Sequence, residues 1–398
     1  MQNNSIRTAN LSNDIHFIIT CCQIEHSDTD TKFITEYLVK KDDAYLKNLI
    51  RLSLRHGILP LVYKVIKEIS TEPNTISKDF LQVLKVQYML ISQKNMLMSA
   101  ELIRVIRLLK ENNIKALAFK GPVLSQMAYG DITLRQYVDI DVLTRKKDVY
   151  KIDSLLKKEG FQRFFVITPS QEKKYLQYAH DLALYNTKRS VHFEMHWAFM
   201  DEDYPMQVDL ESFWEETQEI KINNYALPTF SNENLLYYLC IHGSKHLWER
   251  IEWIKDIDLL VQNYEIDWEI IIQKVKGSGF EKMLYLGLSL SALLFHTTLP
   301  KTIHNQISNY QELDLIQTFI FESWDWGNNK SSFSKTKIML KLFPGVKEQA
   351  LYLHKMILKP SFNEYWYVDL PKGMYWGYYF VRPYLLIKKY LTKDNDPQ

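Results

Sequence analysis

The first part of the chain carries apolar residues at helical spacing. Over residues 58–69 they recur every three or four positions, which predicts an amphipathic helix with Pro60 in its first turn. Ser77 is a suitable N-cap for a second helix from Lys78 to about Glu111, a stretch without glycine or proline. These patterns predict an N-terminal helical region over residues 1–112.

After residue 112, short apolar runs alternate with turns. The runs predict a small mixed β-sheet with strands at residues 115–119, 138–143, 161–167, 182–186 and 190–197. The last two runs flank a polar turn, as in a β-hairpin. Helices are expected at residues 123–129 and 148–159, each followed by a glycine. We therefore expect an α/β core over residues 113–228.

The helical pattern returns after Pro228. Ser231 is a suitable N-cap for a helix that runs to about Val261. Further helices are expected at residues 267–300, 310–323 and 345–358. The aromatic-rich segment 365–390 has no clear period. The predicted fold class is α+β, with a small mixed sheet between the N-terminal helical region and a C-terminal helical region over residues 229–398.

Composition narrows the classes of function. The 398 residues include 49 Lys and Arg against 47 Asp and Glu, a formal charge of +2, which argues against a protein that binds long nucleic acids. The three cysteines form neither a disulfide framework nor a zinc-binding spacing, so a reducing, cytoplasmic location is expected. No stretch approaches the ~18–20 uncharged residues of a membrane span. Arg382 and Pro383 interrupt the best candidate, residues 374–387.

The sharpest chemical feature is Asp139-Ile140-Asp141 within a predicted strand. Residues two apart lie on the same face of a strand, so both carboxylates point one way while Val138, Ile140 and Val142 point into the core. Like charges side by side repel unless a cation lies between them. Mg²⁺ favours oxygen ligands from one or two carboxylates together with substrate phosphates. The alternative is a pair of solvated acids at a strand edge.

A turn ahead of this acidic strand contains Lys120, Gly121 and Pro122. A glycine between a strand and a helix lets the backbone approach a ligand closely, and a helix N-terminus offers free N–H groups to a phosphate. Lys120 would add a positive charge there. Because lysine and glycine are also common in ordinary turns, this feature alone does not identify a site.

The second strand of the predicted hairpin presents His192, Glu194 and His196 on one face. Any half-exposed strand shows such an alternation. A third carboxylate on a neighbouring strand is nevertheless what a two-metal phosphoryl-transfer site requires, because two divalent ions need several negative ligands.

The predicted helix after Ser231 carries a second polar cluster. Spacings of three, four and seven residues place on one face His242, Lys245, His246, Glu249, Trp253 and Asp256. His242 and His246, four positions apart, are also suitably spaced for a transition metal. No glutamate follows His242 in the metalloprotease pattern, which disfavours zinc hydrolysis. The remaining alternatives are a face that lines a substrate cleft and a solvated polar stripe.

Several motifs follow one another in a specific order between about residues 50 and 265. They are Lys120-Gly121-Pro122, Arg135 ahead of Asp139-Ile140-Asp141, Glu194-Met195-His196-Trp197, His242-Gly243-Ser244-Lys245-His246, Trp248-Glu249-Arg250 and Trp253-Ile254-Lys255-Asp256. This combination resembles the uncharacterised nucleotidyltransferase family of the polymerase-beta-like superfamily. Each motif is unspecific by itself, whereas the combination is specific. The resemblance implies a nucleotidyltransferase fold for the α/β core.

The resemblance also implies roles for individual residues. Asp139 and Asp141 would bind Mg²⁺, or Mn²⁺, that bridges a nucleoside triphosphate. Glu194 would help to hold a second ion and would orient or deprotonate an acceptor hydroxyl. Lys120 and Arg135 would contact phosphate oxygens. The other candidates for substrate or phosphate binding are Gly121, His196, His242, Lys245 and His246.

The resulting hypothesis is an Mg²⁺-dependent nucleotidyltransferase. It would transfer a nucleoside monophosphate from a nucleoside triphosphate to a hydroxyl or phosphate acceptor on a small molecule, a sugar or a peptide or protein. The alternative is a non-catalytic module of the same fold that binds a nucleotide or a partner. A third hypothesis is a transition-metal hydrolase that uses His192, Glu194 and His196.

Overall fold

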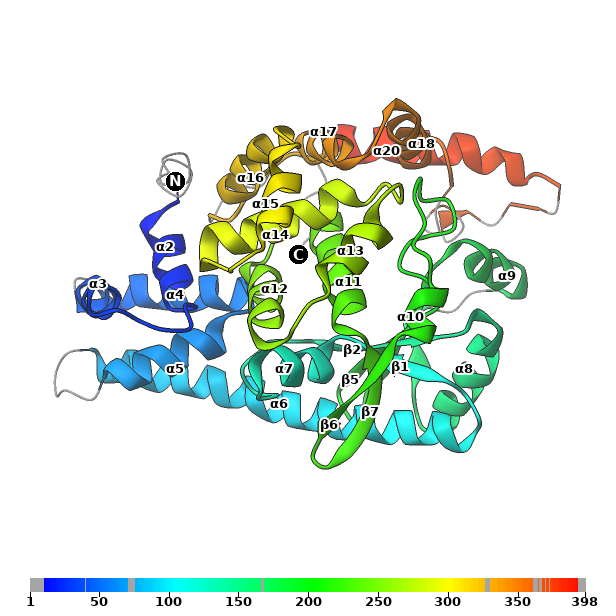
Figure 1. Cartoon of the computed structure of the whole chain (residues 1–398). Coiled ribbons are helices and arrows are strands. Elements are labelled where there is room, and N and C mark those ends of the chain that lie inside the picture. The colour runs from blue at the N-terminus through cyan, green and yellow to red at the C-terminus, as the bar shows by residue number, and fades with distance from the viewer. Residues whose placement is uncertain are drawn as a thin grey trace.

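The computed structural model describes most of the chain. The described residues are 11–39, 41–70, 76–165, 168–325, 330–360, 364, 367–368, 370–371 and 373–392. Their secondary structure is mainly helical around a small mixed sheet, which confirms the predicted α+β class (Figure 1).

The main sheet has five strands in the order β1-β2-β5-β4-β3. Their bounds are Ala116–Ala118 for β1, Asp139–Thr144 for β2, Gln162–Arg163 for β3, Asp181–Asn186 for β4 and Val191–His196 for β5. The β2–β5 pair is parallel and the other pairs are antiparallel, so the sheet is mixed, as predicted. The β4–β5 hairpin is also confirmed. β3 is shorter than the strand expected at 161–167, whose residues 166 and 167 lie outside the described part.

A second sheet was missed by the sequence analysis. It is the antiparallel hairpin of β6 (Thr217–Ile222) and β7 (Tyr225–Phe230), and β7 packs against β1. The two residues between the strands, Asn223 and Asn224, both have positive φ, at 47° and 62°. That conformation is the two-residue turn favoured in hairpins, and asparagine tolerates it better than most residues. The Asn-Asn pair was therefore a usable signal.

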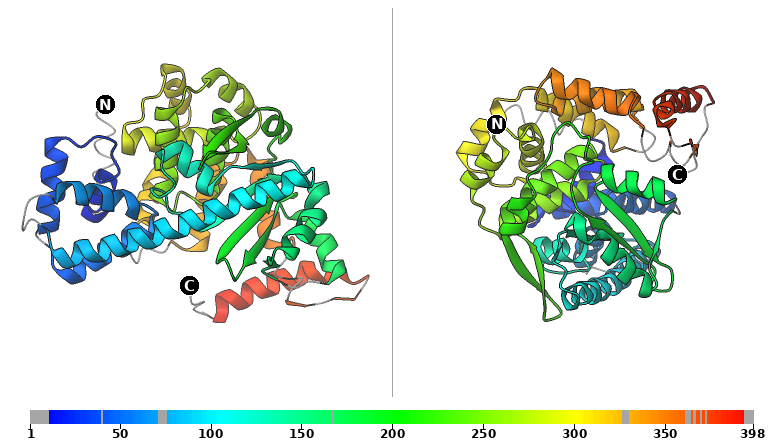
Figure 2. Two further views of the ribbon diagram at one scale, coloured as in Figure 1. Left: turned by 90° about the horizontal axis from the view of Figure 1, so that it is seen from below. Right: turned by 90° about the vertical axis from the view of Figure 1, so that its right-hand side faces the viewer.

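Five helices precede the main sheet in the described part of the chain. They are α2 (Asn13–Thr20), α3 (Asp28–Val39), α4 (Asp43–Arg55), α5 (Leu59–Ile69) and α6 (Lys78–Glu111). The last two confirm the predictions, and the Ser77 side chain caps α6 by accepting a hydrogen bond from Phe80 N. The long α6 runs along the sheet and past the first helices, and in Figure 2 it crosses much of the molecule.

Among the described residues, four helices belong to the predicted core region. They are α7 (Gly121–Tyr129), α8 (Val149–Lys158), α9 (Pro169–Tyr178) and α10 (Glu211–Glu215). The first ends at Gly130, which caps it in the left-handed conformation at φ 67°, as expected. The second confirms the helix predicted at 148–159, preceded by the 3₁₀ turn Lys146–Asp148.

The helices after the second sheet form the upper part of Figure 1. They are α11 (Asn232–Lys245), α12 (Ile251–Asn263), α13 (Trp268–Val275), α14 (Glu281–Phe295), α15 (Lys301–Ser308), α16 (Glu312–Ser323), α17 (Ser332–Leu342), α18 (Val346–Ile357) and α20 (Tyr378–Thr392). Ser231 caps α11 as predicted. The aromatic-rich segment contributes α20, while Tyr365 and Trp366 lie outside the described residues.

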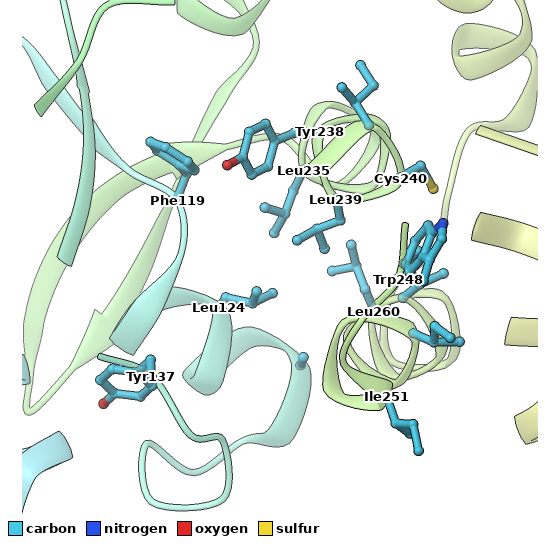
Figure 3. Packing of buried hydrophobic residues seen from close by; sticks show 14 of the residues in the cluster. Phe119, Leu124, Tyr137, Leu235, Tyr238, Leu239, Cys240, Trp248, Ile251 and Leu260 are labelled. Carbon is cyan, nitrogen blue, oxygen red and sulfur yellow. The ribbon is translucent and has the colours of Figure 1, made fainter. Parts of the chain in front are cut away.

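The single helix predicted from Ser231 to Val261 is wrong, because the chain breaks between α11 and α12. Leu247 and Trp248 take left-handed conformations there, with φ of 47° and 51°. The Trp248 ring folds back onto Gly243, where any Cβ would overlap it, and Trp248 N donates to Gly243 O. Figure 3 shows this ring beside the two helices, next to Cys240. Burial of a large ring against a glycine thus overrides helical periodicity.

Two further expectations need comment. Val138 was expected in the core, but its side chain is 48% exposed because β2 begins only at Asp139; Ile140 and Val142 are buried as predicted. The buried apolar residues, from Ile15 to Phe343, form one continuous cluster. The division at residues 112/113 and 228/229 stays a prediction.

In the described part of the chain, no helix has the length and apolar character needed to cross a membrane. The cytoplasmic location stays a prediction.

Candidate active site

The parallel pairing of β2 with β5 sets the geometry of the site. Asp141 lies opposite Glu194, and Asp139 lies opposite His192. Because side chains alternate along each strand, residues directly opposite in this register lie on the same face. Asp141 and Glu194, which lie 53 positions apart in the chain, thus become neighbours.

Asp141 is the most deeply buried acid of this group, with 1% of its surface exposed. Its Oδ1 lies 3.0 Å from Lys120 Nζ and 3.0 Å from His196 Nε2. His196 Nε2 is also 3.4 Å from Glu194 Oε2. Asp141 Oδ2 is buried and has no hydrogen-bond partner among the described residues. One carboxylate oxygen therefore has two cationic partners while the other is unused.

These contacts shift the pKa values of the cluster. Burial would raise the pKa of Asp141, but Lys120 and the hydrogen bond from His196 outweigh it and hold the pKa well below its usual range. Burial alone would lower the pKa of His196, but its bonds to Asp141 and Glu194 raise it to about 9. Lys120 keeps a raised pKa for the same reason, because Asp141 outweighs its burial. At neutral pH the cluster therefore holds paired charges.

Asp141, Glu194 and His196 each offer a ligand atom within 4.8 Å of the others, which is the arrangement of a metal site. Asp139 is not part of this convergent set. It is partly buried, and burial together with the neighbouring Asp141 raises its pKa to about 6. The exposed His192 packs against Phe164 and is also outside the set, so this geometry does not support a metal centre of His192, Glu194 and His196.

In the turn formed by Lys120 and Gly121, the glycine has a structural role, while its part in substrate binding stays a prediction. Gly121 has φ of 54° and is buried, and a Cβ there would lie 3.0 Å from the carbonyl oxygen of Asp139. The glycine therefore lets α7 approach the start of β2. Gly121 does not line the cavity described below, whereas Lys120 does.

Arg135 lies elsewhere. Its guanidinium donates to both carboxylate oxygens of Asp256 on α12, at 2.9 to 3.1 Å, and lies 3.0 Å from Glu252 Oε1. Tyr129 donates a further hydrogen bond to Asp256. Arg135 is 5% exposed and fully engaged with acids, so the structure gives it the role of joining the core to α12. Spacing along the chain gave no indication of partners more than a hundred residues away.

The polar face predicted after Ser231 is divided by the break between α11 and α12. His242, Lys245 and His246 line the cavity as one face of α11 and its C-cap. Trp253 packs edge-on against His242, but Asp256 faces Arg135, and Glu249 pairs with Lys335 at the surface. The six residues therefore do not form one face.

Burial controls the charges on the cavity side of α11. It lowers the pKa of His242 well below the usual value, and it lowers that of His246 to about 4. Burial also lowers the pKa of Lys245 to about 8, and its ammonium donates to the carbonyl of Phe199. Both imidazoles are therefore neutral at pH 7, and Lys245 is mostly charged.

A cavity of about 480 Å³ opens beside the cluster, within the range typical of ligand pockets. Sequence reasoning missed many of its lining residues, among them His180, Asp181, Asp201, Tyr204, Tyr238, Met339, Tyr352, Lys355 and Met356. Tyr238 lies one helical turn before His242, so helical spacing could have found it. The residues of α17 and α18 gave no local signal.

Comparison with known proteins identifies the family of the chain. The family model described as uncharacterised nucleotidyltransferase matches residues 42–296. No curated protein matches the chain. Among solved structures, the solution structure of the antibiotic-resistance factor ANT(2'')-Ia is similar at 13% identity and a TM-score of 0.33, covering 52% of this chain and 97% of that one. That TM-score is too low to inform this chain. The family match extends over well more than half of the chain, which therefore belongs to the uncharacterised nucleotidyltransferase family and is a nucleotidyltransferase.

Proposed function

We propose that the cluster around Asp141 catalyses transfer of a nucleoside monophosphate from a nucleoside triphosphate, with Mg²⁺ or Mn²⁺, to a hydroxyl or phosphate acceptor. The observation that carries this proposal is the unpartnered Oδ2 of Asp141, buried in a cluster that lines a cavity. A buried carboxylate oxygen without a donor is costly unless a ligand completes it.

The residues fit a hard divalent cation. Carboxylate oxygens of Asp141 and Glu194 suit Mg²⁺. Asp139, two residues before Asp141, lies on the same face of β2. When bound, the cation would neutralise the charge that develops on the transferred phosphoryl group. The paired Lys120 and His196 would hold Asp141 in place, and His196 would contact the substrate from the same side.

The triphosphate would bind along α11. Lys245 offers a positive charge at the cavity, and the neutral His242 and His246 offer N–H donors without requiring a further charge to be buried. Lys120, in the turn between β1 and α7, lines the same cavity. Arg135 is not included, because its Nε and Nη2 already contact Asp256 and Glu252 and it does not line the cavity.

The transfer step is a displacement at phosphorus. The acceptor oxygen forms a bond to the α-phosphorus, and the bond from that phosphorus to the oxygen bridging the β-phosphate breaks. Pyrophosphate departs with the electron pair. Glu194, 32% exposed and at the cavity, would orient a hydroxyl acceptor and receive its proton; a phosphate acceptor needs no deprotonation.

The first experiment is incubation of the protein with each labelled nucleoside triphosphate and Mg²⁺ or Mn²⁺, with detection of pyrophosphate and of labelled product. Glu194→Gln should abolish pyrophosphate release, whereas Glu219→Gln, at an exposed position of β6, should leave it unchanged. Equal release from both variants would contradict the proposal. Nucleotide binding without pyrophosphate under any condition would favour the non-catalytic alternative.

A further inference from the structure

The cavity is built from two parts of the chain. Its inner wall comes from the segment that matches the family, including Lys120, Glu194 and His242. Its outer wall includes Met339 of α17 and the α18 residues Tyr352, Lys355 and Met356, which lie beyond residue 296. The C-terminal helices thus complete a site whose acids come from elsewhere.

The outer wall is aromatic and rich in thioethers. The rings of Tyr204 and Tyr352 line the cavity, and both pack against the buried Phe343, which does not line it; the three centroids lie 4.9 to 6.2 Å apart. Met339 and Met356 lie on the same wall. Aromatic faces and flexible thioethers favour flat, apolar ligand groups.

The hydroxyl of Tyr204 gives a second and independent indication of a ligand. It is buried, and it has no hydrogen-bond partner among the described residues, although Tyr204 lines the cavity. A buried hydroxyl without a partner loses free energy that a polar group on a ligand would restore. The wall therefore suits a ligand that combines a ring with a hydrogen-bonding substituent.

Ion pairs hold this wall in place and neutralise it. Lys355 Nζ lies 2.7 Å from Asp201 Oδ2 and 2.7 Å from Asp203 Oδ1, and Lys359 Nζ lies 2.9 Å from Asp203 Oδ2. His180, at the cavity, is 2.6 Å from Asp201 Oδ1. Two lysines thus face two aspartates, and the wall has no surplus positive charge for a triphosphate.

We propose that the wall formed by Tyr204, α17 and α18 is the acceptor subsite, and that it takes an uncharged aromatic alcohol or phenol. This inference rests on the proposed nucleotidyl transfer. A nucleotide is what members of a nucleotidyltransferase family share, whereas the acceptor is what distinguishes them. Apart from Tyr204, the wall belongs to helices outside the family match, and its neutral, aromatic surface suits a ring rather than phosphates.

The test measures ring binding without turnover. N-acetyltyrosinamide is the aromatic probe and methyl glucoside the non-aromatic one, and both are followed by saturation-transfer NMR. Nucleotide affinity is measured separately by calorimetry. The native protein should bind the aromatic probe and not the sugar. Absence of aromatic binding at millimolar concentration, or equal binding of the sugar, would overturn the proposal.

Two substitutions locate the subsite. Tyr352→Ala and Met356→Ala should each weaken aromatic binding by about two- to tenfold, because the first removes a ring contact and the second a thioether contact to the bound ring. Both should leave nucleotide affinity unchanged. Leu351→Ala is the matched control, since Leu351 lies on the same helix, is 45% exposed and does not line the cavity. Met356 lies at the surface and outside the ring cluster, so its variant remains informative if Tyr352→Ala unfolds.

The outcomes separate this inference from the proposed function. A parallel loss of nucleotide affinity in both variants would show that the wall holds the nucleotide base, and would overturn the acceptor assignment. If the aromatic probe binds as expected while Glu194→Gln retains pyrophosphate release, the subsite stands and the catalytic proposal fails. If the probe is a substrate, labelled nucleotide appears on its hydroxyl with release of pyrophosphate.

Discussion

Two of the buried groups of charges in the described part of the molecule differ in whether a cavity opens beside them. The cavity cluster consists of Lys120, Asp141, Glu194 and His196. The closed cluster consists of Tyr129, Arg135, Arg250, Glu252 and Asp256. Both pair acids with cations at about 3 Å. Both oxygens of Asp256 have donors, whereas one oxygen of Asp141 has none among the described residues.

This difference separates a structural role from a chemical one. Burial, ion pairing and shifted pKa values occur in both clusters, so none of them marks a site by itself. A buried carboxylate oxygen without a hydrogen-bond partner among the described residues occurs in both as well, at Asp141 Oδ2 and at Glu252 Oε1. The cavity is what separates them: Lys120, Glu194 and His196, which surround Asp141, line it. Arg135, Glu252 and Asp256 do not. The four predictions below test the contrast, beginning with the largest expected effect.

Asp141→Asn should reduce nucleotidyl transfer by about a thousandfold, because a lost charge at a preorganised transition-state site costs roughly 10²–10³ or more in rate. The same change in the closed cluster, Asp256→Asn, should leave the rate per folded molecule unchanged. Pyrophosphate release, normalised to the folded fraction, measures both. Similar rates for the two variants would remove the distinction between the clusters.

Asp256→Asn should instead lower the free energy of unfolding by about 3–5 kcal/mol, because it removes the charge of the bidentate partner of the buried Arg135 guanidinium and leaves only Glu252 beside it. Asp141→Asn should cost much less, since Glu194 and Asp139 remain near Lys120 and His196. Urea unfolding of the two variants provides the comparison. An equal loss of stability would mean that both clusters are structural.

Gly57→Ala should destabilise the protein by about 1–3 kcal/mol. Gly57 has φ of 74°, and a Cβ there would overlap Glu252 Oε2 in the closed cluster. Gly130→Ala is the matched control, because Gly130 has φ of 67° and no atom within 4 Å of its Cβ position. The difference between the urea-unfolding midpoints of the two variants measures the cost of the overlap with Glu252, because the backbone strain of a positive φ is present in both. Equal effects would show that Glu252 can move aside.

The smallest effect concerns pH. Burial raises the pKa of Glu252 from 4.5 to about 7, with Arg135 and Arg250 opposing the shift. The folded state then binds the proton more tightly than the unfolded state, so stability should fall as pH rises from 4.5 to about 7. The slope from this group is at most about 1.4 kcal/mol per pH unit. Glu252→Gln should flatten it in urea titrations at pH 5, 6 and 7, whereas Glu219→Gln should not.

Much of the local structure could be predicted from the amino-acid sequence. Cap residues and periodicity predicted α5 and α6, the Gly130 cap of α7 and the β4–β5 hairpin. Alternation placed Asp139 with Asp141, and Glu194 with His196, on common faces of their strands. These features depend on neighbours within about a turn of helix or one hairpin, where the pattern of side chains is sufficient.

The sequence by itself therefore determined many of the helices and strands, and it gave the candidate residues of the site. Only the tertiary structure decided which of them meet. Arg135 and Asp256, which form an ion pair, are 121 positions apart in the chain. The break between α11 and α12 depends on the packing of Trp248 against Gly243 and Gly287. The cavity residues of α18 come from beyond the family match. Such contacts arise because burial is collective: a side chain takes the partners that the packed core brings to it, and no local pattern records them.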